Sequence, residues 1–217
     1  MKIITVLNQK GGVAKSTCTH NIAVTTGWGG DIWPANDDLM LASSELLRGD
    51  AHGPNQRMSR ALREWATGYD IVLLDSPPAL SLLTINNLAA SDYVLIPVPG
   101  FTAIDGLSKL LHTIEQVREY ENPQLKILGV LNTMKRKTKH ASETEEIIEE
   151  NLPGAALKTS IPFMTQLENS QPHQMPIREY APGGKVAAAY SALADELLQR
   201  LEMTASTTEP QGFKEAA

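Results

Sequence analysis

One segment constrains the fold of this chain more than any other: Lys10-Gly11-Gly12-Val13-Ala14-Lys15-Ser16-Thr17. It follows an apolar run at residues 3–7 and precedes a helical pattern, which is the position of a strand-to-helix phosphate loop. Paired glycines permit a tight turn that aims backbone N–H groups at phosphate oxygens, and the next helix adds its N-terminal dipole. The segment therefore predicts a nucleotide site in which Lys15 contacts the β- and γ-phosphates and the Ser16 hydroxyl holds Mg²⁺.

The loop departs from the strict phosphate-loop pattern G-x-x-x-x-G-K-[ST] at two positions. Gln9 and Ala14 occupy the two glycine positions of that pattern, and an additional lysine, Lys10, stands at the loop entrance. Lys10 lies too early in the loop to serve the same phosphates as Lys15. The loop is thus a variant of the common form.

Short apolar runs and helical patterns alternate along the chain. The runs are rich in β-branched residues and lie at residues 3–7, 71–74, 93–98 and 126–131, with a weaker one at 157–161. This alternation predicts right-handed βαβ units, hence an α/β fold with a mostly parallel twisted sheet and helices on both faces. We expect residues 1–203 to form a single domain and residues 204–217 to form a disordered tail.

Three helices can be placed from their apolar spacing. The clearest covers residues 104–117 and ends at Asn122-Pro123. Another is expected to begin at about Ser142, where Ser142 and Glu145 have the spacing of a capping box, and a third covers residues 187–201.

Composition argues against a protein that coats nucleic acid with its whole surface, one with an intrachain disulfide and one with a membrane span. The 217 residues carry a net charge of -6, so any contact with DNA must come from a local basic patch. Cys18 is the single cysteine, which fits a reducing cytoplasm and a small core residue. No stretch approaches the roughly 18 apolar residues of a membrane span.

The loop and a second segment resemble a known family. K-G-G-V-[GA]-K-[ST]-T is similar to the deviant Walker A signature of the ParA/Soj branch of the MinD-type ATPases. Residues 69–81, Tyr-Asp-Ile-Val-Leu-Leu-Asp-Ser-Pro-Pro-Ala-Leu-Ser, resemble the family's Walker B strand and switch, and residues 83–98 continue the match. Nearly all of residues 1–200 follow this pattern.

The resemblance implies roles for individual residues. Asp75 ends an apolar strand, where a carboxylate is costly without a compensating cation, so it fits the Walker B position. Lys10 would reach the nucleotide of a partner subunit, and Pro162 would flank adenine. Asn132 could recognise the base or cap a turn. The expected sites are as follows: catalytic Lys10, Lys15 and Asp75; nucleotide-binding Lys10, Gly11, Gly12, Val13, Ala14, Lys15, Ser16, Thr17, Asn132 and Pro162; metal-binding Ser16 and Asp75.

A ParA-like chain is expected to be a weak, Mg²⁺-dependent ATPase of the cytoplasm and nucleoid. It would form a homodimer on ATP, bind DNA nonspecifically, make no membrane contact, and use a ParB-like or cargo-adaptor protein to position plasmids, chromosomes or protein cargo. The expected DNA contacts are Lys135, Arg136, Lys137, Lys139, Arg178 and Lys185, although the run at 135–139 could equally be a solvated loop. Phe163 stands where the family usually carries arginine, which weakens the expectation of DNA binding.

Other functions remain open at this point. A MinD-like membrane-cycling ATPase would need a basic amphipathic C-terminal helix, but this one carries Asp195, Glu196 and Glu202. A metabolic ATP-dependent kinase or ligase, or a scaffold that binds nucleotide without hydrolysis, could use the same loop. An iron–sulfur carrier is excluded by the single cysteine.

One part of the family pattern is missing. Between Gly27 and Asp31 the chain lacks about one βα step of roughly 30 residues, including the Walker A′ aspartate that organises the attacking water in the family. Either the protein lost this step or the sequence joins the two sides of an omitted segment. We favour the second, because loss of a strand would leave its neighbours without hydrogen-bond partners.

Overall fold

A parallel sheet forms the centre of the fold. The computed structural model describes residues 1–25, 31–32, 56–100, 105–136, 140–173, 175–203 and 214–215. Within these residues the main sheet has four parallel strands in the order β3 (Ile71–Asp75), β1 (Lys2–Val6), β4 (Tyr93–Val98) and β5 (Lys126–Asn132). From β1 the chain continues to β3 on one side of the sheet, and from β4 it continues to β5 on the other side. The strand order therefore reverses between β1 and β4, which is where α/β proteins bind ligands.

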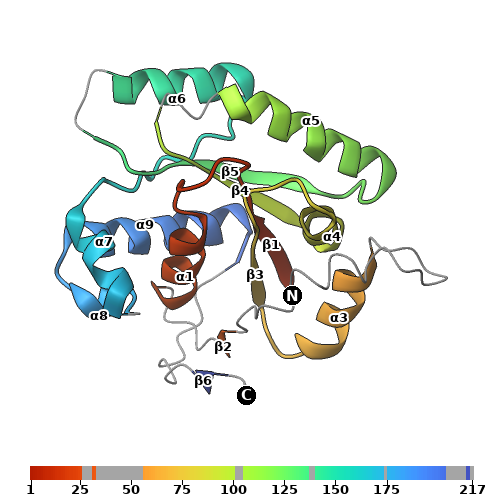
Figure 1. The fold of residues 1–217 in the computed structure, drawn as a ribbon, viewed down its shortest axis with the longest axis horizontal. Helices are drawn as coiled ribbons and strands as arrows, with labels where there is room; N and C mark the ends of the chain where they lie inside the picture. Colours follow the sequence, from red (N-terminus) through yellow and green to blue (C-terminus); the bar gives the residue numbers. More distant parts are fainter. Residues whose placement is uncertain are drawn as a thin grey trace.

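Helices cover both faces of this sheet (Figure 1). On one face lie α1 and α9, and on the other lie α4, α5 and α6. The predicted fold class is therefore confirmed. The bounds of the helices and of a separate strand pair are α1 (Lys15–Thr25), α3 (Arg57–Trp65), α4 (Leu82–Ala90), α5 (Asp105–Tyr120), α6 (His140–Asn151), α7 (Thr165–Ser170), the 3₁₀ helix η3 (Gln171–His173), α8 (Ile177–Tyr180), α9 (Lys185–Arg200), β2 (Asp31–Ile32) and β6 (Lys214–Glu215).

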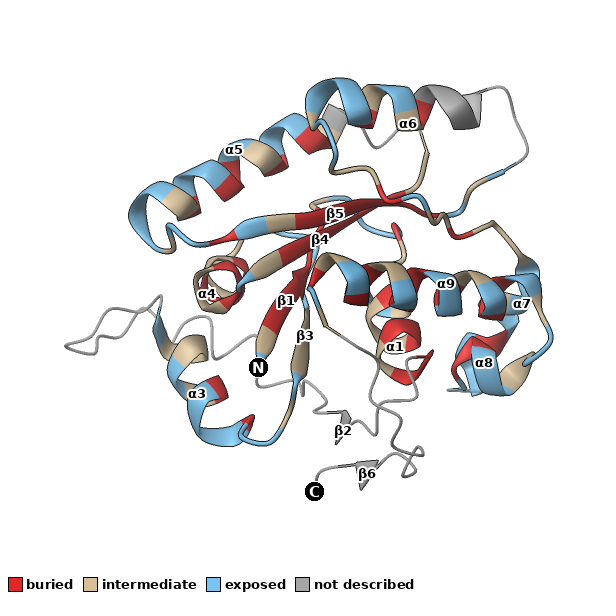
Figure 2. Cartoon of the chain, turned by 180° about the vertical axis from the view of Figure 1, so that it is seen from behind, coloured by how far each residue is buried: buried red, intermediate tan, exposed pale blue. Residues whose placement is uncertain are grey.

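The core has two parts because successive strand residues point to opposite faces. Val6 and Leu95 pack with α1 and α9, whereas Leu7 and Ile96 pack with α4 and α5. Figure 2 shows the buried sides of these helices turned toward the sheet. None of the described helices combines the length and the apolar character of a membrane-spanning segment.

Cys18 is a core residue, as predicted. It is fully buried on α1, and its Sγ lies 3.5 Å from the hydroxyl oxygen of Tyr190 on α9. Burial raises the pKa of the Cys18 thiol to about 12, so it remains protonated near neutral pH. This contact fixes the helix that follows the phosphate loop against α9.

Strand β3 is an edge of the described sheet. It pairs with β1 on one side, and its four apolar residues, 71–74, are only partly buried. The predicted missing βα step lies outside the described residues, as does most of the predicted tail, residues 204–213 and 216–217.

Two predictions about local structure were wrong. The segment 157–161 forms no continuous strand: the N–H groups of Leu157 and Ile161 donate to carbonyl oxygens of β5, but the N–H of Thr159 between them donates to the Glu196 carboxylate. Helix α6 begins at His140, close to the predicted start at about Ser142, but Ser142 then lies inside the helix and is not its N-cap. Ala141 has a high helix propensity, which allows the helix to start before the serine.

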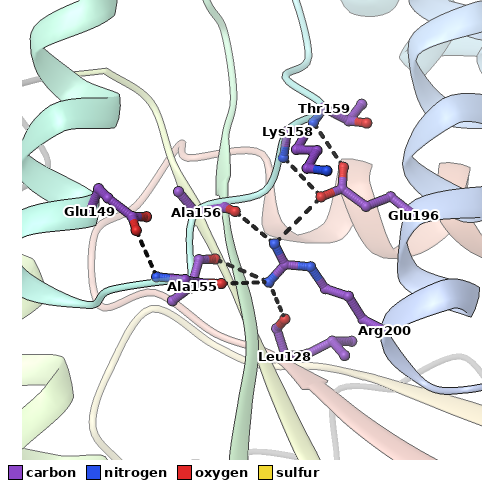
Figure 3. Close-up of polar contacts among 9 residues, drawn as sticks. Leu128, Glu149, Ala155, Ala156, Lys158, Thr159, Glu196 and Arg200 are labelled. Atoms are coloured by element: carbon purple, nitrogen blue, oxygen red, sulfur yellow. Dashed lines mark hydrogen bonds and ion pairs between the residues drawn. The ribbon is translucent and has the colours of Figure 1, made fainter.

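Arg200, near the end of α9, hydrogen-bonds to the backbone of β5 and of the segment that follows α6 (Figure 3). Its Nη1 donates to the carbonyl oxygen of Leu128 at 3.0 Å, and its Nη2 donates to that of Ala156 at 2.7 Å. Glu196 accepts the N–H groups of Lys158 and Thr159, both at 2.8 Å, and these bonds lower the pKa of its carboxyl group despite its partial burial. Side chains of α9 therefore hold residues 154–159 beside β5.

We predict that Arg200→Ala lowers the free energy of unfolding by about 1–3 kcal/mol, because partly buried carbonyl oxygens lose their donors. Gln199→Ala, at the neighbouring exposed position, should change it by less than about 0.5 kcal/mol. Urea denaturation followed by circular dichroism measures both variants. Equal stability of Arg200→Ala and the parent would show that these hydrogen bonds contribute nothing.

Candidate functional site

The loop between β1 and α1 is held in a defined conformation. Buried Asn8 anchors its entrance, since its Nδ2 donates to the carbonyl oxygen of Pro97 at 2.7 Å and its Oδ1 accepts the N–H of Lys10 at 2.9 Å. Gly12 and Ala14 have φ angles of 71° and 65°. Ala14 adopts the left-handed region, in which the strict pattern places glycine, at a cost of roughly 1–2 kcal/mol. Such strain is typical of functional loops.

Three predicted residues meet at the end of β1 and β3. The strand register pairs Val6 with Asp75, which brings the Asp75 carboxylate to the start of α1. The Ser16 hydroxyl donates to Asp75 Oδ2 at 2.5 Å. Lys15 is 7% exposed, and its Nζ donates to the carbonyl oxygen of Lys10 at 3.1 Å.

The electrostatics of this cluster suit a cation and phosphates. Desolvation raises the pKa of Asp75, although the Ser16 hydroxyl and Lys15 oppose the shift. Desolvation also lowers the pKa of Lys15, which the Asp75 charge opposes. Lys15 is buried and Asp75 lies at the exposed end of β3, so phosphate oxygens would be favoured near Lys15 and a cation near Asp75.

The described residues contain no cluster of three or more His, Cys, Asp or Glu side chains able to hold a metal ion. Mg²⁺ at nucleotide sites does not require one, because it keeps several waters and takes phosphate oxygens with one or two protein ligands. Ser16 and Asp75 fit that pattern.

A second group of predicted residues lies next to the loop. The Thr133 hydroxyl donates to the carbonyl oxygen of Val13 at 3.3 Å, and the N–H of Ile161 donates to that of Asn132 at 2.9 Å. Two backbone hydrogen bonds with Lys135 flank Pro162. The Lys135 N–H donates to the carbonyl oxygen of Ile161, and the Phe163 N–H donates to the carbonyl oxygen of Lys135. The structure thus brings together the phosphate loop, Asn132 and Pro162, which are far apart in the sequence.

The segment after Asp75 is fixed at its beginning. Ser76 is buried, and its hydroxyl oxygen accepts the Asn87 Nδ2 at 3.0 Å from α4. Pro77 and Pro78 follow outside the strand, since proline has no backbone N–H to donate to a sheet.

Three of the predicted DNA contacts, Lys135, Arg136 and Arg178, have partners within the chain. Lys135 Nζ lies 2.6 Å from Glu145 Oε1, the Arg136 guanidinium stacks 4.2 Å from the Phe163 ring centre, and Arg178 Nη1 donates to the carbonyl oxygen of Thr25 at 3.0 Å. Lys185 is the exposed first residue of α9. Lys137 and Lys139 lie outside the described residues.

Sequence reasoning missed Asn8, Glu145 and Arg200. Asn8 had a local signal, because a polar residue directly after a buried strand is expected near a site at the sheet edge. Glu145 has the spacing of a capping residue, which concealed its place near Asn132. Arg200 gave no signal, since the backbone carbonyl oxygens that it contacts lie 44 to 72 residues away in the chain.

The parallel sheet with a phosphate loop between its strand β1 and helix α1 defines a P-loop nucleotide-binding protein of the α/β class. Comparison with known proteins identifies the family within that class. A family profile described as an AAA domain matches residues 25–127. The chromosome-partitioning ATPase Soj of Thermus thermophilus is 37% identical over 171 residues, which cover 78% of this chain and 66% of that protein.

The sporulation initiation inhibitor protein Soj of Bacillus subtilis is 35% identical over 187 residues, covering 85% of this chain and 70% of that protein. The chain therefore belongs to the ParA/Soj family of P-loop ATPases. Among solved structures, cobyrinic acid a,c-diamide synthase of Mycobacterium smegmatis with bound ADP and magnesium has a TM-score of 0.77 at 25% identity, and 99% of each chain is covered.

A further relative bears on the missing step. An uncharacterized protein of Mycobacterium tuberculosis is 30% identical over an alignment of 256 positions, which is longer than the 217 residues of this chain. That relative therefore has residues that this chain lacks. The position of the missing step between Gly27 and Asp31 stays a prediction.

We predict that Gly12→Ala lowers the free energy of unfolding of the nucleotide-free protein by about 1 kcal/mol, because its φ is positive although an added Cβ would meet nothing within 4 Å. Gly11→Ala is the matched control, since it has the same free space and no positive φ; it should be neutral or stabilising by up to about 1 kcal/mol. Urea denaturation measures both, and equal effects would contradict the loop conformation.

Proposed function

We propose that this chain binds Mg²⁺–ATP at the loop of residues 10–17 and acts as a partition ATPase. In this proposal it hydrolyses ATP slowly, forms a dimer on ATP, binds DNA nonspecifically in the cytoplasm, and positions DNA or protein cargo together with a ParB-like or cargo-adaptor protein. The observation that carries the proposal is the hydrogen bond from Ser16 to Asp75 beside buried Lys15, in a chain of the ParA/Soj family.

Unpaired polar atoms support a nucleotide at this site. Gln9 Nε2 and Asn132 Oδ1 are buried and have no hydrogen-bond partner among the described residues. Buried polar atoms are normally paired, so both fit contacts to a bound ligand. The solved structure of the cobyrinic acid a,c-diamide synthase contains ADP and magnesium, which is consistent with the same ligand class here.

The residues have distinct tasks in this proposal. The N–H groups of residues 11–16 and the α1 dipole bind the phosphates, and Lys15 exchanges its bond to the Lys10 carbonyl for phosphate oxygens. Ser16 and Asp75 hold the metal, which would neutralise charge that develops on the phosphates. Lys10 is an exposed residue at the loop entrance, where it could reach a second subunit.

We predict that Lys15→Ala weakens ATP binding by about tenfold to a hundredfold, because it removes a charge-assisted hydrogen bond to phosphate. Lys10→Ala is the matched lysine variant and should keep ATP affinity but lose either the ATP-dependent dimer or hydrolysis. Titration with a fluorescent ATP analogue gives the affinities, and a sizing column with ATP, ADP or no nucleotide gives the dimer. Unchanged affinity in Lys15→Ala, or equal dimer populations in all three conditions, would contradict the proposal.

DNA binding rests on the basic segment at residues 135–139. Two of its side chains are engaged, Lys135 with Glu145 and Arg136 with Phe163, although Arg136 remains exposed and its charge is not neutralised by stacking. On a chain with a net charge of -6, such a local cluster is the feature able to attract phosphates.

We predict that replacing Arg136, Lys137 and Lys139 by alanine weakens binding to all duplex DNA sequences alike. The log–log salt slope should become shallower by about 0.9 for each DNA phosphate that the variant no longer neutralises. Alanine at exposed Lys109, Lys126 and Lys158 removes the same charge elsewhere and should have a smaller effect. If the two triple variants bind DNA equally with ATP present, the segment is a solvated loop.

A metabolic ATP-dependent ligase is the second candidate, because the structure resembles a synthase over 99% of both chains. The identity is 25% in that comparison and 35% to 37% with the two Soj proteins, which favours partition.

A further inference from the structure

The side chain of Asn132, the last residue of β5, contacts a carboxylate of α6. Its Nδ2 lies 3.4 Å from Glu145 Oε1, and Lys135 Nζ lies 2.6 Å from the same oxygen. Lys135 thus holds the carboxylate that faces the amide. The contact joins two elements that flank the predicted base-binding end of the site.

This contact decides how the Asn132 amide is oriented. An ionised carboxylate only accepts hydrogen bonds, so the amide nitrogen must face Glu145 and the amide oxygen must face away from it. The reverse orientation would set two acceptor oxygens against each other. In the observed orientation Asn132 Oδ1 is buried and has no partner among the described residues.

The unpaired oxygen belongs to a residue that is tied to both parts of the site. The next residue, Thr133, donates to Val13 of the phosphate loop, and the Asn132 carbonyl oxygen accepts the N–H of Ile161, which precedes Pro162. Asn132 Oδ1 is covered by protein atoms, so neighbouring side chains must move aside when a purine binds between these segments; the purine then meets an acceptor and no donor from the Asn132 side chain. Such an acceptor matches an amino group on the base and repels a carbonyl oxygen.

We propose that Glu145, held by Lys135, is a positioning residue that fixes the Asn132 amide with its oxygen toward the base and thereby selects 6-amino purines over 6-oxo purines. This inference rests on the proposed function. A 6-oxo purine leaves the buried acceptor unpaired, which costs about tenfold to a hundredfold in affinity.

The test compares the dissociation constants of ATP and ITP, which differ at position 6 of the purine, in competition with a fluorescent ATP analogue and Mg²⁺. The parent should prefer ATP by about tenfold to a hundredfold. Glu145→Gln offers a donor as well as an acceptor and frees the amide to rotate, so the preference should fall to about threefold or less.

Glu146→Gln is the matched control on α6, since Glu146 is exposed, and it should keep the preference of the parent. The side chains of Lys135 and Glu145 are 33% and 41% exposed, so breaking their pair should leave the fold intact. Glu145→Ala, which removes the acceptor without adding a donor, should give the same loss of preference and serves if Glu145→Gln folds poorly.

A double variant separates positioning from direct contact. Asn132→Ala should abolish the preference, and adding Glu145→Gln to it should change nothing further. An unchanged ATP preference in both Glu145 variants, or an equal loss in Glu146→Gln, would overturn the inference while leaving ATP binding in place. A parent that binds neither ATP nor ITP would overturn the proposed function, and this inference with it.

Discussion

The register between β1 and β3 is the constraint on which the site depends. Because Val6 pairs with Asp75, the carboxylate stands beside the first turn of α1, where Ser16 reaches it at 2.5 Å. A slip of one residue would turn Asp75 to the other face of the sheet. The buried contacts of α1 with α9, including Cys18 with Tyr190, hold the helix in the position that this bond requires.

The two ends of the site are supported by different elements. The predicted phosphate end rests on β1, β3 and α1, whereas the predicted base end rests on β5 and on the segment after α6, to which Arg200 and Glu196 of α9 hydrogen-bond. Helix α9 packs against α1 as well, so one helix supports both ends. Because α9 contacts both α1 and the segment after α6, the loop before α1 and that segment keep fixed positions relative to each other.

The sequence was sufficient where the signal was local. The loop between a strand and a helix at residues 10–17, strand 93–98 and the buried position of Cys18 follow from apolar runs and from neighbouring residues, and the structure agrees. It was insufficient where partners lie far apart: Glu196 takes the N–H groups of residues 158 and 159 and so interrupts the predicted strand. The contact of Glu145 with Asn132 depends on how α6 packs against β5, whereas its spacing from Ser142 indicates only a capping residue.

We propose that Ser16 and Asp75 form the metal half of an ATP site. The most direct measurement is a calorimetric titration of the nucleotide-free protein with ATP, in Mg²⁺ and in EDTA, for the parent and for Ser16→Ala. We predict that Mg²⁺ tightens ATP binding to the parent by at least about tenfold, corresponding to about 1.4 kcal/mol, and that Ser16→Ala loses most of this gain. Equal ATP affinity of the parent in Mg²⁺ and in EDTA would contradict it.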